Sequence, residues 1–176
     1  MSAGPSGLPP VRVGQGFDIH PFADDPERRL VLGGVEIPGA PGLAGHSDAD
    51  ALTHALTDAV LGAAGLGDIG RHFPDTDPAY AGADSLELLR RAVVMAGDEG
   101  LVALNADCTV VCERPRLADH VAAMVERLGD ALGAPVNVKA TRAEGLGALG
   151  RAEGIAALAV VLFAADGASA ASGGGS

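Results

Sequence analysis

Hydrophobic and polar positions divide the middle of the chain into short strands and amphipathic helices. Val11 begins a strand that Pro21 ends, since proline cannot continue a ladder. The apolar runs 29–32 and 35–37 flank a Gly-Gly pair, a spacing typical of a β-hairpin. Further strands are predicted over three apolar runs: 105–112, 136–139 and 155–163.

Three segments place apolar residues at the spacing of one helical face. The first lies around Leu52 and Leu56, and we expect Ser47 or Asp48 to cap its start. It should end near the glycines at 65–67. The other two helices are expected to begin at the Asp84-Ser85 pair and at Leu117, the latter running to Leu132.

Segments rich in glycine, proline and aspartate are predicted as loops: 38–42, 68–70, 73–78 and 144–154. The last of these is also compatible with a short broken helix. Strands and helices alternate after the early hairpin. This order favours an α+β fold, with a single two-layer domain, a mixed β-sheet and helices on one face.

Composition bounds the domain and its partners. The 176 residues suit one domain, predicted over 11–166, while the Pro-, Gly- and Ser-rich ends predict a disordered extension over 1–10 and a flexible tail over 167–176. A net charge of −11 argues against nucleic acid or an anionic membrane as a partner. There is no signal peptide and no apolar run of about 18 residues, so a soluble, cytoplasmic protein is expected. Cys108 and Cys112 lie in an apolar run and are expected as buried, reduced thiols.

Asp18, His20 and His54 are the candidate metal ligands. Asp18 and His20 are two residues apart in a predicted strand, so their side chains point to the same face. An isolated Asp-x-His pair is more often structural, but His54 adds an imidazole from a helix. Two imidazoles and one carboxylate with an open fourth position form a known catalytic zinc arrangement.

His46 and Ser47 precede the first helix, where free backbone N–H groups favour phosphate. We therefore interpret His46 as a phosphate donor rather than a metal ligand. Asp68, between two glycines, suits a sugar diol and equally suits a turn. Asp75 and Asp77 could bind a metal or form a rigid Pro-Asp-Thr-Asp-Pro turn, and Glu144 could bind Mg²⁺ or lie on the surface of a glycine-rich loop.

Several motifs together resemble the 2-C-methyl-D-erythritol 2,4-cyclodiphosphate synthase family, in order over nearly all of 11–165. The matching stretches are Gly16-Phe17-Asp18-Ile19-His20, Leu32-Gly33-Gly34-Val35, the run from His46-Ser47-Asp48 to Asp58-Ala59, Leu66-Gly67-Asp68-Ile69-Gly70, Phe73-Pro74-Asp75-Thr76-Asp77, Asn137-Val138-Lys139-Ala140-Thr141, Gly150-Arg151 and Glu153-Gly154-Ile155. So many linked motifs make chance similarity a poor explanation.

The resemblance implies a homotrimer with active sites between neighbouring subunits. It implies an intramolecular attack by the 2-phosphate of 4-diphosphocytidyl-2-C-methyl-D-erythritol 2-phosphate on the β-phosphorus. CMP leaves and the cyclodiphosphate forms, a step of the non-mevalonate isoprenoid precursor pathway. Zn²⁺ would be held by Asp18, His20, His54 and a substrate phosphate oxygen, and Mg²⁺ by Glu144 across the nucleotide diphosphate.

The resemblance also implies roles along the whole chain. Asp18, His46 and Arg142 are predicted as the catalytic residues. The predicted substrate-binding residues are His46 and Ser47 for phosphate; Asp68 for the ribose, with Ile69 and Gly70; Phe73, Pro74, Asp75, Thr76 and Asp77 over the erythritol part; Cys112, Pro115, Arg116 and Leu117 around the cytosine; and Ala140, Thr141, Arg142, Glu144, Ala148 and Arg151.

Two positions depart from the family pattern. The family usually has Thr or Ser directly after Thr141, whereas this chain has Arg142, which binds phosphate with a different reach and charge. The family often has an aromatic residue where this chain has Ala148. Arg151 and Glu153 are retained, so the resemblance still allows an isoprenoid diphosphate on the trimer axis.

Two other functions remain compatible with the same residues. A zinc-dependent phosphohydrolase would place water at the open coordination position and would need a general base, for which Asp50 and Asp58 are candidates. An inactive trimeric binding module would have lost activity through the change at Arg142.

Overall fold

The structure, a computed structural model, describes residues 10–166. The N-terminal extension, apart from Pro10, and the tail predicted from the sequence lie outside the described residues. A mixed sheet runs in the order β1 (Val11–Pro21), β6 (Gly154–Ala165), β4 (Leu101–Val111) and β5 (Val136–Thr141). Only the β4–β5 pair is parallel among these neighbours. The predicted mixed sheet is therefore confirmed.

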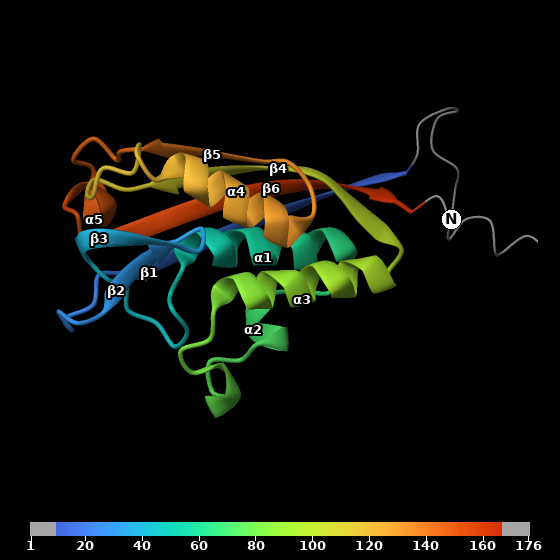
Figure 1. Cartoon of the computed structure of the whole chain (residues 1–176), viewed down its shortest axis with the longest axis horizontal. Coiled ribbons are helices and arrows are strands. Elements are labelled where there is room, and N and C mark those ends of the chain that lie inside the picture. Colours follow the sequence, from blue (N-terminus) through green and yellow to red (C-terminus); the bar gives the residue numbers. More distant parts are fainter. Residues whose placement is uncertain (1–9, 167–176) are drawn as a thin grey trace, which may run out of the picture.

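Three longer helices cover one face of this sheet (Figure 1). Helix α1 (Ala51–Ala64) packs on β1 and β6, α4 (Val121–Leu132) packs on β5, and α3 (Ser85–Asp98) packs against both helices. Strands β2 (Arg29–Leu32) and β3 (Val35–Pro41) form the predicted hairpin. Short helices follow at α2 (Ile69–His72), η1 (Pro78–Tyr80) and α5 (Gly147–Gly150). The single α+β domain is confirmed.

The sequence-based prediction misplaced two helix starts, missed the short helices α2 and η1, and ended the second hairpin strand too early, because β3 continues to Pro41 through the predicted 38–42 loop. Helix α1 is capped by Asp50, whose side chain accepts a hydrogen bond from Thr53 N, and not by Ser47 or Asp48. Helix α4 begins at Val121 rather than at Leu117. Helix α2 begins in the predicted 68–70 loop and continues to His72, because the Asp68 side chain accepts a hydrogen bond from Arg71 N and caps the turn.

The core lies between the sheet and the helices. Leu52, Leu56, Leu89, Met124 and Phe163 are fully buried there. Alternate residues of β1 face α1, and two of them are Gly14 and Gly16. A Cβ on Gly16 would lie 1.9 Å from the carbonyl oxygen of Ala55. The absence of a side chain on this face therefore lets α1 lie directly on the strand that carries the candidate ligands.

Gly16→Ala is expected to lower the free energy of unfolding by at least about 1–3 kcal/mol, because helix backbone must move to admit the methyl group. Urea unfolding measures this loss. Gly97→Ala is the control, since no described atom outside the immediate helix backbone lies within 4 Å of its added Cβ, and alanine favours helix by about 0.5–1 kcal/mol. Equal stability of the two variants would contradict close α1–β1 packing.

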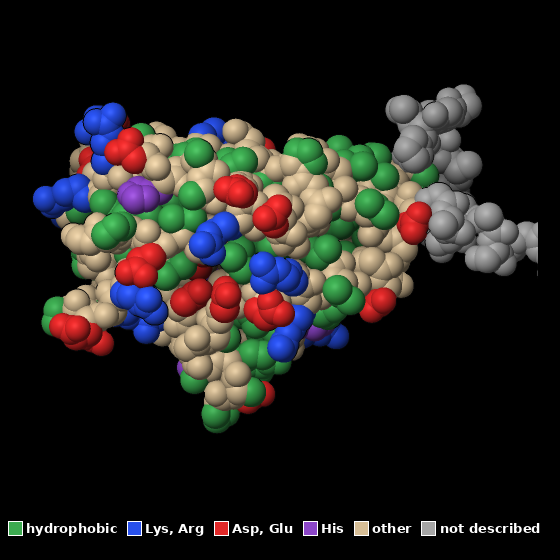
Figure 2. Space-filling view, viewed as in Figure 1, with side chains coloured by type: hydrophobic (Ala, Val, Ile, Leu, Met, Phe, Trp, Pro, Cys, Tyr) green, Lys and Arg blue, Asp and Glu red, His purple; other side chains and the backbone are tan. Residues whose placement is uncertain are grey.

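The surface is mixed in charge where the helices face outward. Figure 2 shows Lys and Arg side chains interspersed with Asp and Glu on the face formed by α3 and α4. This face therefore offers no continuous basic surface of the kind that nucleic acid binds. Within residues 10–166, none of the helices combines the length and the apolar character needed to span a bilayer.

Candidate active site

The three predicted metal ligands converge at the junction of β1 and α1. Asp18 and His20 point from β1 toward the helix, and His54 points back from the first turn of α1. Asp18 Oδ2 lies 2.9 Å from His20 Nε2 and 3.1 Å from His54 Nδ1. The three ligand atoms all lie within 4.8 Å of one another, the one such cluster found in residues 10–166. One carboxylate oxygen and two imidazole nitrogens suit a divalent metal.

The outer nitrogens of both histidines are already engaged. His20 Nδ1 lies 2.7 Å from the carbonyl oxygen of Ala44, which can only accept, so Nδ1 carries the proton. His54 Nε2 lies 2.8 Å from Ser85 Oγ and 3.1 Å from Ser47 Oγ. The inner nitrogens, His20 Nε2 and His54 Nδ1, both face one oxygen of Asp18. A shared cation between these three atoms fits the chemistry of the donor set.

Proton equilibria of the cluster follow from the same contacts. The hydrogen bond to Asp18 raises the pKa of His20, against the opposing effect of burial. Burial raises the pKa of Asp18, but the hydrogen bonds and charges of His20 and His54 together lower it well below its usual range. Asp18 is therefore an anionic ligand over the physiological range. A metal must displace the proton on Nε2 of His20, while the proton on Nδ1 stays. Metal affinity should therefore fall as the pH falls through the raised pKa of His20.

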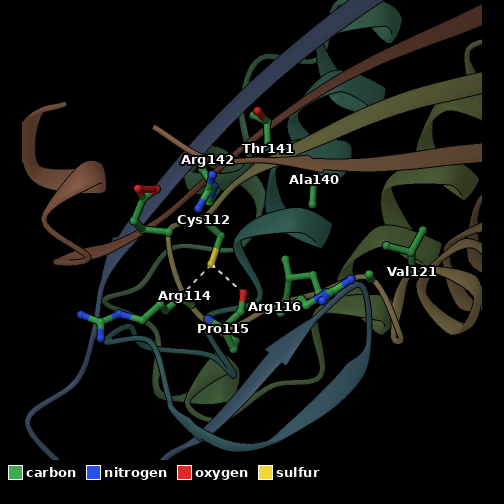
Figure 3. Close-up of a pocket in the computed structure, with 11 residues that line it drawn as sticks. Cys112, Arg114, Pro115, Arg116, Val121, Ala140, Thr141 and Arg142 are labelled. Atoms are coloured by element: carbon green, nitrogen blue, oxygen red, sulfur yellow. Dashed lines mark hydrogen bonds between the residues drawn. The ribbon is translucent and has the colours of Figure 1, made fainter. Parts of the chain in front are cut away.

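A cavity of about 760 Å³ lies at the ends of β4 and β5. Seven of the predicted substrate-binding residues line it: Cys112, Pro115, Arg116, Leu117, Ala140, Thr141 and Arg142. Figure 3 shows the sulfur of Cys112 directed at the carbonyl groups of Arg114 and Pro115, at 2.8 and 3.6 Å. Burial raises the pKa of Cys112 to about 11, so its thiol is protonated and unreactive at neutral pH.

Glu113 and Arg114 also line this cavity; the resemblance implies that backbone groups of about residues 112–118 bind the cytosine, but no side-chain role was predicted for these two residues. Glu113 Oε1 accepts a hydrogen bond from Gly145 N at 3.2 Å. Its other oxygen, Oε2, is buried and has no partner among the described residues. A donor on a bound ligand would satisfy it. The signal for this loop in the sequence was the family resemblance around Pro115, and nothing in the sequence indicated that the side chain of Glu113 turns inward.

The segment 46–48 lies between the metal cluster and the 73–84 loop. His46 Nε2 donates to the carbonyl oxygen of Asp77 at 3.1 Å, and the carbonyl oxygen of His46 accepts from Gly82 N at 2.9 Å. Phe73 and Tyr80 meet edge to face at 5.6 Å between ring centroids and order the loop. The structure thus brings Ser47 against the ligand His54, at 3.1 Å, and Asp77 against His46.

Ile69, the first residue of α2, is held to α1 by Asp58. Asp58 Oδ1 accepts from Ile69 N at 2.7 Å, and burial raises the pKa of Asp58. The Asp68 side chain caps α2, so the turn-forming role weighed from the sequence is present. Asp50, the other candidate base for hydrolysis, is fully buried and serves as a backbone acceptor, so it cannot meet a water molecule.

The remaining predicted residues lie beyond the cavity wall. Glu144 is exposed and pairs with Arg142, with 3.5 Å between Oε1 and Nη2. Arg151 pairs with Glu153 at 2.6 Å just after α5, the helix that contains Ala148. The lining of the 760 Å³ cavity includes Arg142 but not Glu144, Ala148 or Arg151.

The cluster and the cavity lie at the same end of the sheet. His20 pairs with Ile155 of β6, and the adjacent residue Ala156 pairs with Val111 of β4, which itself pairs with Thr141 of β5. An open metal-ligand cluster and a ligand-sized cavity at one end of a mixed sheet define the class of protein: a single-domain α+β protein with a candidate metal-dependent active site. The chain belongs to the YgbB family, whose model matches residues 11–164.

Relatives and solved structures agree with this membership and confirm the resemblance seen in the motifs. The chain is 59% identical over 156 residues to the 2-C-methyl-D-erythritol 2,4-cyclodiphosphate synthase of Ralstonia pickettii, covering 87% of this chain and 92% of that protein. The fold is similar, at a TM-score of 0.78 and 39% identity, to a 2C-methyl-D-erythritol-2,4-cyclodiphosphate synthase in a CDP-bound form, covering 86% of this chain and 99% of that one. It is also similar, at a TM-score of 0.85 and 43% identity, to the bifunctional IspDF of Campylobacter jejuni, covering 90% of this chain and 43% of that longer chain.

Proposed function

We propose that the chain converts 4-diphosphocytidyl-2-C-methyl-D-erythritol 2-phosphate to 2-C-methyl-D-erythritol 2,4-cyclodiphosphate and CMP. The reaction belongs to the phosphorus–oxygen lyase class and to the non-mevalonate route to isoprenoid precursors. The observation that carries the proposal is the convergence of Asp18, His20 and His54 at the same end of the sheet as the 760 Å³ cavity. Family membership and the high identity to named cyclodiphosphate synthases support the same reaction.

The reaction needs little covalent chemistry from the protein. The substrate's own phosphate is the nucleophile, so no serine or cysteine nucleophile is required, and the protonated Cys112 is consistent with this. Nucleophile and electrophile are both anionic, and they must be folded against each other. Well-oriented intramolecular reactions gain on the order of 7–11 kcal/mol. When bound, Zn²⁺ at the cluster supplies Lewis-acid polarisation of a phosphate oxygen, and Mg²⁺ at Glu144 neutralises negative charge on the nucleotide diphosphate.

Different side chains position different parts of the substrate and the metal. Asp18, His20 and His54 hold the first metal, and His46 and Ser47 grip a phosphate from the adjacent turn. Asp68, Ile69 and Gly70 bind the ribose, and residues 73–77 cover the erythritol part. Arg142, on the cavity wall, contacts the phosphates in place of a hydroxyl.

The cavity formed by the 112–118 loop binds the cytidine. The CDP-bound relative supports a nucleotide in this fold. The unpartnered Oε2 of Glu113 also suits a base that carries an exocyclic amino donor, as cytosine does. Discrimination against uridine would follow, because uracil presents a carbonyl oxygen where cytosine presents this donor.

The chain assembles as a homotrimer in this proposal. The sheet face opposite the helices exposes apolar side chains, including Val13 at 65%, Phe17 at 51% and Val160 at 44%. The register places Phe17 beside Leu158 and Val13 beside Leu162 on this face, with Gln15 and Val160 paired between them. A second subunit packed on it would bury that surface. An isoprenoid diphosphate near Arg151 on the trimer axis, and a cytoplasmic location, complete the proposal.

Incubation with the cytidine diphospho-substrate, Zn²⁺ and Mg²⁺ is expected to give equal amounts of CMP and cyclodiphosphate. ³¹P NMR and chromatography measure the two products. Linear hydrolysis products would indicate the phosphohydrolase instead. Binding without turnover would indicate an inactive binding module. Sedimentation equilibrium on the same preparation should give about three times the 17.4 kDa chain mass, and a monomer would contradict the proposed assembly.

A further inference from the structure

We infer that Asp48 and Ser85 form a relay that fixes the ring of His54, so that Nδ1 faces the metal position. Ser85 is the first residue of α3, and it is fully buried. Its Oγ lies 2.8 Å from His54 Nε2 and donates a hydrogen bond to Asp48 Oδ1. Both residues act here as positioning residues, because neither reaches the three ligand atoms. The inference rests on the metal site of the proposed function.

Proton accounting sets the direction of the relay. A carboxylate can only accept, so the hydroxyl proton of Ser85 points toward Asp48. The lone pairs of the Ser85 oxygen are then left for His54, and Nε2 must carry the proton that it donates. Nδ1 lies 3.1 Å from Asp18 Oδ2 and shares a proton with it; when a metal displaces that proton, the imidazole keeps its one N–H at Nε2, and the Nδ1 lone pair is left for the metal. This is the tautomer that a metal at Nδ1 requires.

Asp48 is itself held on several sides, which makes the relay rigid. Its Oδ2 accepts from Ser85 N at 3.1 Å, and its Oδ1 also accepts from Asp50 N at 3.2 Å. Its own backbone N donates to the carbonyl oxygen of Ala83 at 3.2 Å. Asp48 therefore ties the segment before α1 to the start of α3. The orientation of His54 depends on this junction.

Ser47 is the competing partner of His54 Nε2, and the contacts favour Ser85. Ser47 Oγ is farther away, at 3.1 Å, and it accepts from Ala49 N. Among residues 10–166 Ser47 Oγ makes no hydrogen bond to a carboxylate, so nothing dictates where its proton points. Ser47 remains available for the phosphate.

The two histidine ligands are thus oriented by different means. The carbonyl oxygen of Ala44, a fixed backbone acceptor, sets the tautomer of His20. His54 depends on two side chains, one of them on a helix that begins 31 residues later. A change at the start of α3 should therefore disturb the metal through His54 alone.

Ser85→Ala is expected to raise the zinc Kd by roughly 10- to 100-fold, the usual range for loss of a partner behind a ligand. Competition with a chromophoric chelator measures this Kd. ¹⁵N NMR of the zinc-loaded protein should show His54 protonated at Nε2 and bound to the metal through Nδ1 in the natural chain, and a mixture of the two ring orientations in Ser85→Ala. Ser85→Thr keeps the hydroxyl and should restore both readouts.

Thr57→Ala is the matched control, because it removes another buried hydroxyl, which donates to Thr53 O at 2.8 Å on the helix of His54. It should keep the zinc Kd and the tautomer even if its stability falls. Should Ser85→Ala fail to fold, Asp48→Asn tests the same relay, since an amide no longer dictates the direction of the Ser85 proton.

Unchanged zinc Kd and an unchanged tautomer in the folded Ser85 or Asp48 variant would overturn the relay. A tautomer shift in Ser47→Ala, with none in Ser85→Ala, would overturn it as well. Failure of the natural chain to bind zinc would instead contradict the metal site itself. The two failures are therefore distinguishable.

Discussion

His54→Ala is expected to lose the metal and the cyclisation together. The side chain supplies one of three protein ligand atoms, and the two that remain, on Asp18 and His20, come from a single strand. Loss of a partner behind a ligand typically costs about 10- to 100-fold in metal affinity, so loss of the ligand itself should cost more than about 100-fold. Metal analysis after gel filtration, and the rate of CMP release, measure the two effects.

His72→Ala provides a control of the same residue type. His72 Nε2 donates to the carbonyl oxygen of Leu66 at 2.9 Å, and His72 is outside the three-residue cluster. This variant should keep the metal content of the natural chain. A His54→Ala protein that retained its full metal content would refute the ligand assignment, whatever its activity.

The metal cluster could be predicted because its geometry is mostly local. Asp18 and His20 share a face through the two-residue period of a strand, and this holds wherever the strand lies. Their meeting with His54 needed one further step, the close packing of α1 on β1. Gly14 and Gly16 are the sequence signal for this packing, since they place no side chain on the face of the strand toward the helix.

The relay and the buried oxygen of Glu113 could not be predicted because they depend on distant segments. Ser85 reads as an ordinary helix-start residue, and its bond to His54 exists only because α3 packs across α1. Glu113 reads as a surface glutamate in a turn, yet one of its oxygens is buried in the cavity wall. Local patterns give the identity of such groups but not their neighbours.

The cap of α1 shows how several correct candidates can compete for one role. Ser47, Asp48 and Asp50 all suit an N-cap by residue type. Ser47 lies against His54, Asp48 binds the start of α3, and only Asp50 caps the helix. Contacts with residues distant in sequence decide which of the three caps the helix, and helix propensity does not include such contacts.

Asp50→Ala is expected to lower the free energy of unfolding by about 3–5 kcal/mol, because it leaves several buried hydrogen-bond donors without an acceptor. The carboxylate accepts from Gly33 N at 2.9 Å, Gly34 N at 2.7 Å, Thr53 N at 2.9 Å and Thr53 Oγ1 at 2.7 Å. Burial raises the pKa of Asp50, and the hydrogen bonds from Thr53 and Gly34 oppose that rise. Chemical denaturation of the metal-free protein measures the loss without a contribution from bound metal.

Asp84→Ala separates this effect from ordinary capping. Asp84 caps α3 by accepting one bond, from Leu86 N at 2.9 Å, so its loss should cost only about 0.5–2 kcal/mol. Asp50 differs because it also holds the Gly33-Gly34 turn of the hairpin against the start of α1. If Asp50→Ala cost no more than Asp84→Ala, the turn would be held by other contacts. A larger cost for Asp50 means that one carboxylate joins the hairpin to the helix that carries His54, so stability and ligand placement depend on the same residue.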